Sequence, residues 1–254
     1  SYINGLTNIP FSIEATTVNK PVDRTGQPIL MPEVNREKID EYKNLLINYF
    51  PTRYSGPLLA KLRKKYWEKE HVSGKPFVIA IADCQFKGAG NISHDALPLY
   101  LYGFIQKVTP DGLEEREDIN CHIWGAKEVP SGFFNFEGAE NISAIFFSPS
   151  NDIDKFNRMG LKDGFNERKY KIKRTVKLPN THSWEIESII KIVPTKKYTE
   201  TWDEGLIVYH NPNALHPFPK AILPNATHYY VNNDRIFIEF NTPPIIEDTS
   251  EIIK

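Results

Sequence analysis

The chain has 254 residues, of which 40% are hydrophobic, and its formal net charge is −1. This size and composition allow one large hydrophobic core or two small ones. The near-neutral charge argues against a protein that coats nucleic acid without sequence preference, because such binding depends on neutralising phosphates. No apolar run approaches the roughly 18 residues of a membrane span, so we expect no membrane partner.

The cysteines and the start of the chain indicate its setting. Cys84 and Cys121 are the only cysteines, and they form neither a metal-ligand pattern nor a disulfide framework. Such sparse cysteines fit the reducing cytoplasm. No signal-peptide pattern opens the sequence, and because it begins at Ser1 without a methionine, we expect native residues upstream.

The first third of the chain predicts two strands separated by two helices. Alternating side chains over residues 11–19 (FSIEATTVN) predict the first strand. After a proline-bearing loop, residues 35–50 predict a helix with Asn35 as its N-cap, and a second helix is expected from Pro57. Residues 75–83 (KPFVIAIAD) form a nearly continuous apolar run, which is typical of a central strand covered on both faces.

Side-chain spacing divides the two helices into faces. In the first helix, apolar side chains recur at helical spacing and predict a buried stripe of Ile39, Tyr42, Leu46 and Tyr49. In the second, charged side chains at helical spacing share one face, formed by Lys61, Lys64, Lys65 and Glu68. Charged faces of this kind are more often solvated than bound to phosphate.

The remainder of the chain favours strands. A helix is expected from the cap Ser93, a buried strand at 141–150 and a helix that ends at Gly160. Turn signals separate five later strands, at 169–178, 183–193, 205–210, 227–233 and 235–240. We therefore predict an α/β fold with a mixed central sheet flanked by helices and a strand-rich C-terminal extension, in a single domain over 1–254.

Two short motifs look like catalytic signatures but have simpler explanations. KGAGN at 87–91 lacks the third glycine of a dinucleotide-binding loop and the Gly-Lys-Ser/Thr of a Walker loop. SHD at 93–95 contains the residue types of a serine triad, but such triads are assembled from distant parts of a chain. A turn and the start of a helix explain these two segments.

The loop HNPNALHPFP at 210–219 concentrates polar side chains after a strand. His210 and His216 could share a metal ion with a distant carboxylate. The alternative is a rigid loop in which side chains cap backbone groups and prolines fix the path. The rigid loop is favoured, because zinc sites usually show tighter pairs and more Cys or His.

Glu14 and Thr16 lie on one face of the first strand, ahead of the lysine-faced helix and the second strand. Metal-dependent nucleases hold Mg²⁺ with acidic oxygens on adjacent strands, and a nearby lysine polarises the attacking water or steadies the phosphate. Glu14 with Lys61 or Lys64 supplies part of such a set, and Asp83 is a fallback second acid. The alternatives are a solvent-facing Glu14 and an Asp83 that caps the following turn.

FSIEATTVN resembles the second half of the active-site motif of the PD-(D/E)XK nuclease-like superfamily, which has the restriction-endonuclease fold. In that motif an acid is followed two residues later by lysine or, in divergent members, by another polar residue. Glu14 matches the acid, and Thr16 stands at the lysine position. Further stretches resemble a group of bacterial proteins associated with this superfamily: 56–85, 97–104, 138–160 and 210–219. The resemblance implies a nuclease-like core over 1–104, with 105–254 packed on it as a mixed α/β extension.

The sequence departs from this motif in two ways. The superfamily's first aspartate normally lies on the preceding strand, and residues 1–13 contain no aspartate. Thr16 replaces the motif lysine, so Lys61 or Lys64 would have to take its place from the helix. An aspartate upstream of Ser1 would complete the motif.

Two functions follow from these observations. The first is a Mg²⁺- or Mn²⁺-dependent nuclease, or the nuclease-like domain of a host-defence or restriction system. Its catalytic residues would be Glu14, Thr16 and Lys61, its metal ligands Glu14 and Asp83, and its nucleic-acid contacts Lys64 and Lys65. The second is a catalytically inactive nuclease-fold module that binds nucleic acid, a partner protein or a second copy of itself in a larger complex. The missing aspartate and motif lysine favour this second function.

Overall fold

The computed structural model describes residues 2–3, 9–35, 37–86, 90–108, 114–148, 153–162, 169–179, 184–193, 200–241 and 245–253. The helices are α1 (Ile39–Asn44), the π-helix η1 (Leu45–Tyr49), α2 (Phe50–Arg63), α3 (Gly90–Tyr102) and α4 (Ile153–Lys162), with short 3₁₀ turns η2 (Tyr66–Glu68), η3 (Phe133–Asn135), η4 (Ala139–Asn141) and η5 (Lys220–Ile222). The strands are β1 (Tyr2–Ile3), β2 (Pro10–Asn19), β3 (Phe77–Cys84), β4 (Phe104–Val108), β5 (Glu114–Asp118), β6 (Cys121–Trp124), β7 (Lys127–Pro130), β8 (Ala144–Ser148), β9 (Lys169–Pro179), β10 (Trp184–Val193), β11 (Ile207–His210), β12 (Thr227–Asn232), β13 (Arg235–Glu239) and β14 (Ile245–Ile253).

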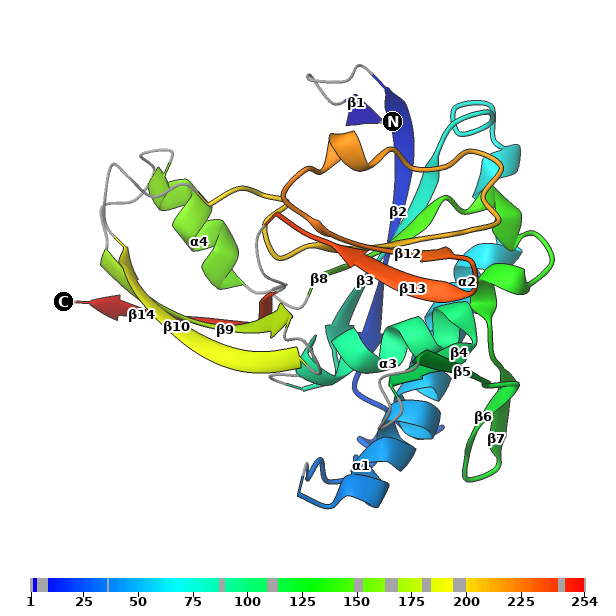
Figure 1. Cartoon of the computed structure of the whole chain (residues 1–254), viewed down its shortest axis with the longest axis horizontal. Coiled ribbons are helices and arrows are strands. Elements are labelled where there is room, and N and C mark those ends of the chain that lie inside the picture. Colours follow the sequence, from blue (N-terminus) through cyan, green and yellow to red (C-terminus); the bar gives the residue numbers. More distant parts are fainter. Residues whose placement is uncertain are drawn as a thin grey trace.

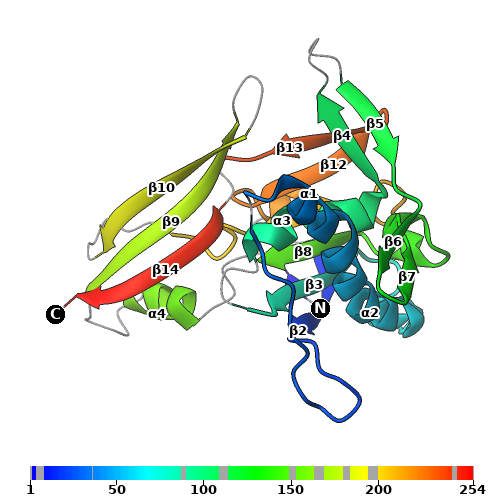
Figure 2. The ribbon, with the colours of Figure 1, turned by 90° about the horizontal axis from the view of Figure 1, so that it is seen from below.

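The central sheet is mixed, which confirms the predicted fold class at this level. Its strands lie in the order β1-β2-β3-β8-β11-β12-β13, and β2, β3 and β8 are parallel neighbours. Parallel neighbours need crossover connections, and here the crossovers carry α1, α2 and α3. These three helices lie together over one face of the sheet (Figures 1 and 2). A separate sheet, β10-β9-β14, lies to one side with α4, whereas the C-terminal strands β11, β12 and β13 belong to the central sheet (Figure 1).

The register of β2 and β3 decides which side chains share a face. Glu14 is opposite Ile79, and Thr16 is opposite Ile81. Because side chains alternate along a strand, these residues face the helices and the odd-numbered residues of β2 face the other way. The alternation predicted for FSIEATTVN is therefore confirmed.

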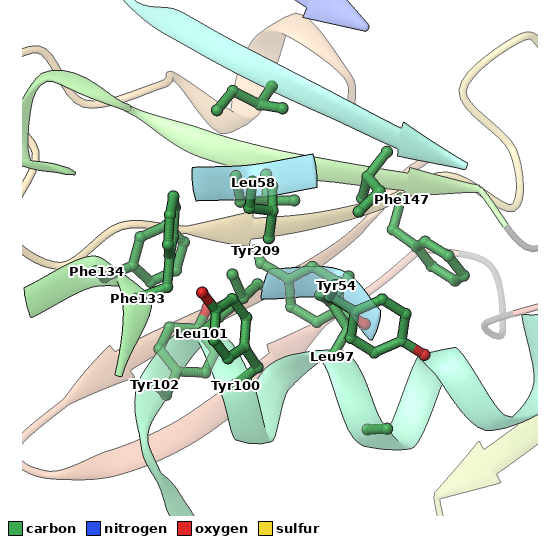
Figure 3. Packing of buried hydrophobic residues seen from close by; sticks show 14 of the residues in the cluster. Tyr54, Leu58, Leu97, Tyr100, Leu101, Tyr102, Phe133, Phe134, Phe147 and Tyr209 are labelled. Carbon is green, nitrogen blue, oxygen red and sulfur yellow. The ribbon is translucent and has the colours of Figure 1, made fainter. Parts of the chain in front are cut away.

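The main core fills the space between the sheet and the helices. Figure 3 shows aromatic and aliphatic side chains from several elements that meet there, including Tyr54 and Leu58 of α2, Leu97 and Leu101 of α3, and Tyr209 of β11. All five are at most 1% exposed. Burial of this many large apolar groups supplies the main driving force that holds the helices on the sheet.

The predicted break between the first two helices is wrong. The chain is helical without interruption from Ile39 to Arg63, and the segment that contains Gly56 and Pro57 lies inside α2. The predicted N-cap Asn35 accepts a hydrogen bond from the backbone of Glu37 and lies before the helix. The helix start is solvated, and Ile39 of the predicted buried stripe is 61% exposed.

Two prolines inside this helical layer leave carbonyl groups that side chains from other elements satisfy. Pro51 has no N–H for the carbonyl of Ile47 four residues earlier, and His122 of β6 donates a hydrogen bond to that carbonyl through Nδ1. Pro98 likewise has no N–H for the carbonyl of His94, which accepts a 3.3 Å hydrogen bond from Tyr209. Tertiary contacts thus stabilise helices that carry prolines in their interiors.

Two further helix boundaries differ from the sequence prediction. α3 begins at Gly90 rather than after Ser93, and α4 continues past Gly160 to Lys162. Ser93 therefore lies within α3, and its hydroxyl donates a hydrogen bond to Asp83 on β3.

No described helix combines the length and apolarity that a membrane span requires.

The β12–β13 hairpin confirms the turn signal VNND. Asn233 and Asp234 have φ angles of 48° and 60°, and they join strands whose last pair is Asn232 with Arg235. Positive φ at both central residues defines the two-residue type I′ turn, for which Asn and Asp are favoured.

A buried ion network ties α4 to the small sheet. Arg158 of α4 donates two hydrogen bonds to Glu200, at 3.0 and 3.1 Å, and Arg174 of β9 lies 2.7 Å from the same carboxylate. Arg174 also donates to Glu204 at 2.6 Å. These ion pairs hold α4 against β9. Without their partners, the buried charges would destabilise the fold.

Candidate functional site

Glu14 on β2 and Lys61 on α2 form an ion pair, although they lie 47 positions apart in the sequence. Glu14 projects from the helix-covered face of the sheet, and α2 crosses that face (Figure 2). The Lys61 side chain is 15% exposed and the Glu14 side chain 29% exposed. The structure therefore brings together the acid and one of the helix lysines that the sequence analysis proposed.

Tyr66 completes this contact from the turn after α2. Its hydroxyl donates a 3.0 Å hydrogen bond to Oε1 of Glu14, the same oxygen that Lys61 contacts. The Tyr66 ring packs on Phe77 of β3, with ring centroids 5.9 Å apart. Because that packing fixes the ring, Tyr66 holds Glu14 in one orientation.

Three lysine side chains surround the Tyr66 ring. The ammonium groups of Lys61, Lys64 and Lys69 lie 6.0, 5.8 and 4.9 Å from the ring centroid. Cations at this distance from an aromatic ring are attracted by its electron-rich face. We call Glu14, Tyr66 and these three lysines the lysine–tyrosine cluster.

Lys65 lies beside this cluster without contacting the Tyr66 ring. Its backbone is left-handed, with φ of 45°, and it separates the end of α2 from η2. Its ammonium group lies 3.7 Å from Glu68, and both side chains are more than half exposed. Of the two predicted nucleic-acid contacts, Lys64 belongs to the cluster, and Lys65 makes a solvated pair at its edge.

The charges of the cluster act on Glu14. The hydrogen bond from Lys61 lowers the pKa of the Glu14 carboxyl below its ordinary value of 4.5, with further help from Tyr66 and from the charge of Lys64, although partial burial opposes the shift. Glu14 is therefore ionised at neutral pH. An ionised carboxylate is the form that accepts hydrogen bonds and binds cations.

Comparison with known proteins identifies no relative of this chain. No protein-family model, no curated protein and no solved structure matches the chain. The chemistry of the site therefore rests on its own residues.

Asp83 lies apart from Glu14. Val18 is the partner of Asp83 in the register, so the two carboxylates are four residues apart along neighbouring strands, about 13 Å at the rise of a β-strand. In this arrangement no single ion touches both. The two metal ligands proposed from the sequence are thus not brought together.

Asp83 is held in a buried polar network of its own. It is 6% exposed, and its carboxylate accepts hydrogen bonds from Ser93 and from the backbone and side-chain nitrogens of Gln85, the latter two at 2.9 and 3.1 Å. Burial raises the pKa of Asp83 above its ordinary value of 3.8. The hydrogen bond to the Gln85 backbone is the turn cap that the sequence analysis gave as the alternative to a metal ligand.

Thr16 lies two residues after Glu14 but is not part of the cluster. With Ala80, Ser148 and Leu206 it lines an open groove of about 550 Å³ on the sheet. The described residues that line this groove carry no charge. The structure therefore gives Thr16 no described contact with the acid or the lysines.

The histidine loop at 210–219 has the character of a rigid structural element. His210 and His228 share a 2.9 Å hydrogen bond between Nε2 and Nδ1, and His216 is exposed. Asn211 donates hydrogen bonds of 2.8 and 2.7 Å to the carbonyls of Ala139 and Ile142. These contacts agree with the favoured interpretation, in which side chains cap backbone groups.

The SHD segment does not form a triad. Ser93 donates to Asp83, whereas His94 contacts its neighbour Asp95 at 3.1 Å through Nδ1 and the hydroxyl of Tyr229 at 3.0 Å through Nε2. His94 is 2% exposed. The segment ties α3 to β3 and β12. KGAGN overlaps residues outside the described ranges.

The cluster has features that fit one divalent cation. Both hydrogen bonds to Glu14 fall on Oε1, and Oε2 accepts none from the described residues. Mg²⁺ is commonly held by one or two carboxylates together with water and substrate phosphate. Across the described part of the chain, no group of three or more His, Cys, Asp or Glu is arranged around a common ion position. Glu14 therefore offers a single carboxylate oxygen, Oε2, to an ion.

Tyr66 and Lys69 are the members of the cluster that the sequence analysis did not assign to a site. The Tyr66 ring packs inward, against Phe77. Its hydroxyl reaches Glu14 because the left-handed turn at Lys65 redirects the chain after α2. The run KKYWEKE carried a signal, since an aromatic residue among lysines is a common feature of nucleic-acid surfaces.

Proposed function

We propose that this protein is a divalent-cation-dependent nuclease, with Mg²⁺ or Mn²⁺ as its cofactor and Glu14 as the metal ligand. The observation that supports the proposal is the contact between Glu14 and Lys61, which joins an acid and a lysine from different elements. In this arrangement Lys61 takes the place of the lysine that the superfamily motif carries two residues after the acid. Nucleic acid is the substrate class.

The residues of the cluster have distinct roles in this proposal. Lys61 contacts the phosphate beside Glu14, and Lys64 and Lys69 hold the neighbouring backbone through charge. Tyr66 is a positioning residue, because it fixes Oε1 of Glu14. When bound, a divalent cation would supply Lewis-acid stabilisation of the phosphate and a water of lowered pKa.

The test is a cleavage assay on plasmid, single-stranded DNA and RNA, with Mg²⁺ or Mn²⁺ and with EDTA. We expect cleavage that requires the metal and that falls by at least about a hundredfold in Glu14→Gln, because the substitution removes the ligand charge while preserving shape. Glu33→Gln is the matched control, since Glu33 is exposed and distant in sequence from the cluster. Metal-dependent cleavage that persists in Glu14→Gln would contradict the assignment.

A binding module without catalysis is the second candidate, and one observation favours it. Glu14 is the only carboxylate among the described residues with a hydrogen bond to the lysines of the cluster, and one of its oxygens is already occupied by Lys61 and Tyr66. In this case the lysines would hold phosphate with no turnover under any metal. A partner protein or a second copy of the chain would complete the assembly.

Salt dependence distinguishes phosphate contact from a solvated lysine face. If Lys64 contacts a phosphate, Lys64→Gln should reduce the slope of log affinity against log salt by about 0.7 to 0.9. Lys43→Gln is a suitable control, because Lys43 is an exposed lysine of α1. An unchanged slope in Lys64→Gln would show that Lys64 is solvated and does not contact a phosphate.

A further inference from the structure

The positive charge of the lysine–tyrosine cluster is gathered around one aromatic ring. Three ammonium groups lie within 6.0 Å of a single ring centroid, at Tyr66. One of them, Lys61, is neutralised by Glu14, which leaves Lys64 and Lys69 as the charges offered to a ligand at the ring. Two positive charges beside one ring differ from a track of single charges along a surface.

This difference matters because nucleic acid presents phosphate in two forms. An internal phosphodiester carries one negative charge, and successive charges are spaced along the strand. A terminal phosphate monoester carries about −1.5 to −2 at neutral pH and offers three acceptor oxygens at one point. Two exposed lysine side chains beside one ring match the second form better, since their flexible stems allow both ammonium groups to reach one phosphate group.

The surroundings of the Tyr66 ring also suit the binding of a strand end better than the binding of a continuous duplex. η2 is only three residues long and follows a left-handed turn at Lys65, so the cluster occupies the corner between α2 and η2. A duplex-binding surface would need phosphate contacts spread over a longer face, with several charges in register with the backbone. The four lysines here fall within nine consecutive residues, Lys61 to Lys69.

We propose that Lys64 and Lys69, beside Tyr66, form a binding site for the terminal phosphate monoester of a nucleic acid strand. The inference rests on the proposed function, because it assumes that nucleic acid is the substrate class. It goes further by naming the substrate as a strand with a phosphorylated end. Held there, the end would lie next to Glu14 and Lys61, so that the first bonds of the strand are presented to them.

The test compares affinities for three versions of one short single-stranded DNA: with a 5′-phosphate, with a 3′-phosphate and with hydroxyls at both ends. Binding is measured in EDTA, so that no cleavage occurs. We expect one phosphorylated version to bind about tenfold more tightly than the hydroxyl version, as one additional charge-assisted hydrogen bond would give. The advantage should shrink between pH 7 and pH 5, because the monoester loses its second charge near pH 6.

Variants separate the terminal site from general attraction. The tenfold preference should vanish in the double variant Lys64→Gln/Lys69→Gln and persist in Lys43→Gln, and all three lysines are exposed. Equal affinity for all three DNAs would overturn this inference while leaving the proposed function standing. Failure to bind or cleave any of the DNAs would instead contradict the proposed function itself. A preference that survives the double variant would place the phosphate elsewhere and overturn the site.

Discussion

Lys61 controls the charge environment of Glu14. Its ammonium group contacts Oε1 of the carboxylate, and this contact is the main reason for the lowered pKa of Glu14. Alternation along β2 and helical spacing on α2 made both residues candidates, and the resemblance of FSIEATTVN to the nuclease motif singled out Glu14. The contact of the Tyr66 hydroxyl with Glu14 could not be predicted from the sequence, because it depends on the left-handed turn at Lys65, which no local pattern specifies.

Replacing Lys61 should change the titration of Glu14. In Lys61→Met we expect the pKa of the Glu14 carboxyl to rise toward or above its ordinary value of 4.5, because the principal hydrogen bond is lost and partial burial remains. Carboxyl ¹³C chemical shifts measured against pH check this. Lys43→Met is the control and should leave Glu14 unchanged; a Glu14 pKa that is the same in both variants would show that Lys61 does not govern it.

Tertiary contacts help to determine where the helices of this protein begin and end. The sequence predicted a second helix that starts at Pro57 after Gly56, since glycine and proline usually interrupt helices. The chain remains helical because Pro51 lies at the start of α2 and His122 satisfies the carbonyl of Ile47. The donor lies 75 residues away in the sequence, so no local pattern could have revealed it.

The hydroxyl of Tyr209 supports α3 in the same way. It donates to the carbonyl of His94, for which Pro98 has no N–H. We expect Tyr209→Phe to lower the free energy of unfolding by about 1 kcal/mol, because the substitution removes one hydrogen bond and leaves the ring in place. Urea denaturation measures the change.

Tyr230→Phe is the control for that measurement. Tyr230 is partly exposed, and the described residues give its hydroxyl no hydrogen bond, so its removal should have little effect. If the two variants are equally stable, the Tyr209 hydroxyl does not support α3.

At the scale of the whole molecule, the alternating strands and helices of the sequence were enough to predict a mixed α/β fold. The separate sheet β10-β9-β14 was not distinguished from the central one, because strand propensity does not say which strands pair. The buried network of Arg158, Arg174 and Glu200 was also hidden, since charged residues are usually expected at the surface. The sequence therefore did not predict which strands pair, or which charged side chains from distant parts of the chain form ion pairs.

Buried histidines make the stability of the whole fold depend on pH. Burial, together with the charges of His228 and Lys220, lowers the pKa of His210 from 6.5 to about 3, and burial also lowers the pKa of its partner His228. Between these values the unfolded chain binds a proton that the folded chain does not. The free energy of unfolding should therefore be highest above about pH 6.5 and fall as the pH decreases toward 3.

Denaturation measured at pH 7.5 and at pH 5 checks this dependence. The loss of stability between the two should be smaller in His210→Phe, because that variant has one fewer histidine to protonate on unfolding. His71→Asn is the control, since His71 is exposed. An identical loss in the wild type and in His210→Phe would show that this pair does not contribute.

We propose that Glu14 and Lys61 work as one site, and a double-mutant cycle on the rate of metal-dependent DNA cleavage tests this proposal. Residues that act as a unit are strongly non-additive. We predict that Glu14→Gln and Lys61→Gln each reduce the rate by at least about a hundredfold and that the double variant loses little more than either. Rate losses that multiply in the double variant, or a Glu14→Gln rate equal to the wild type, would show that the two residues do not form one catalytic site.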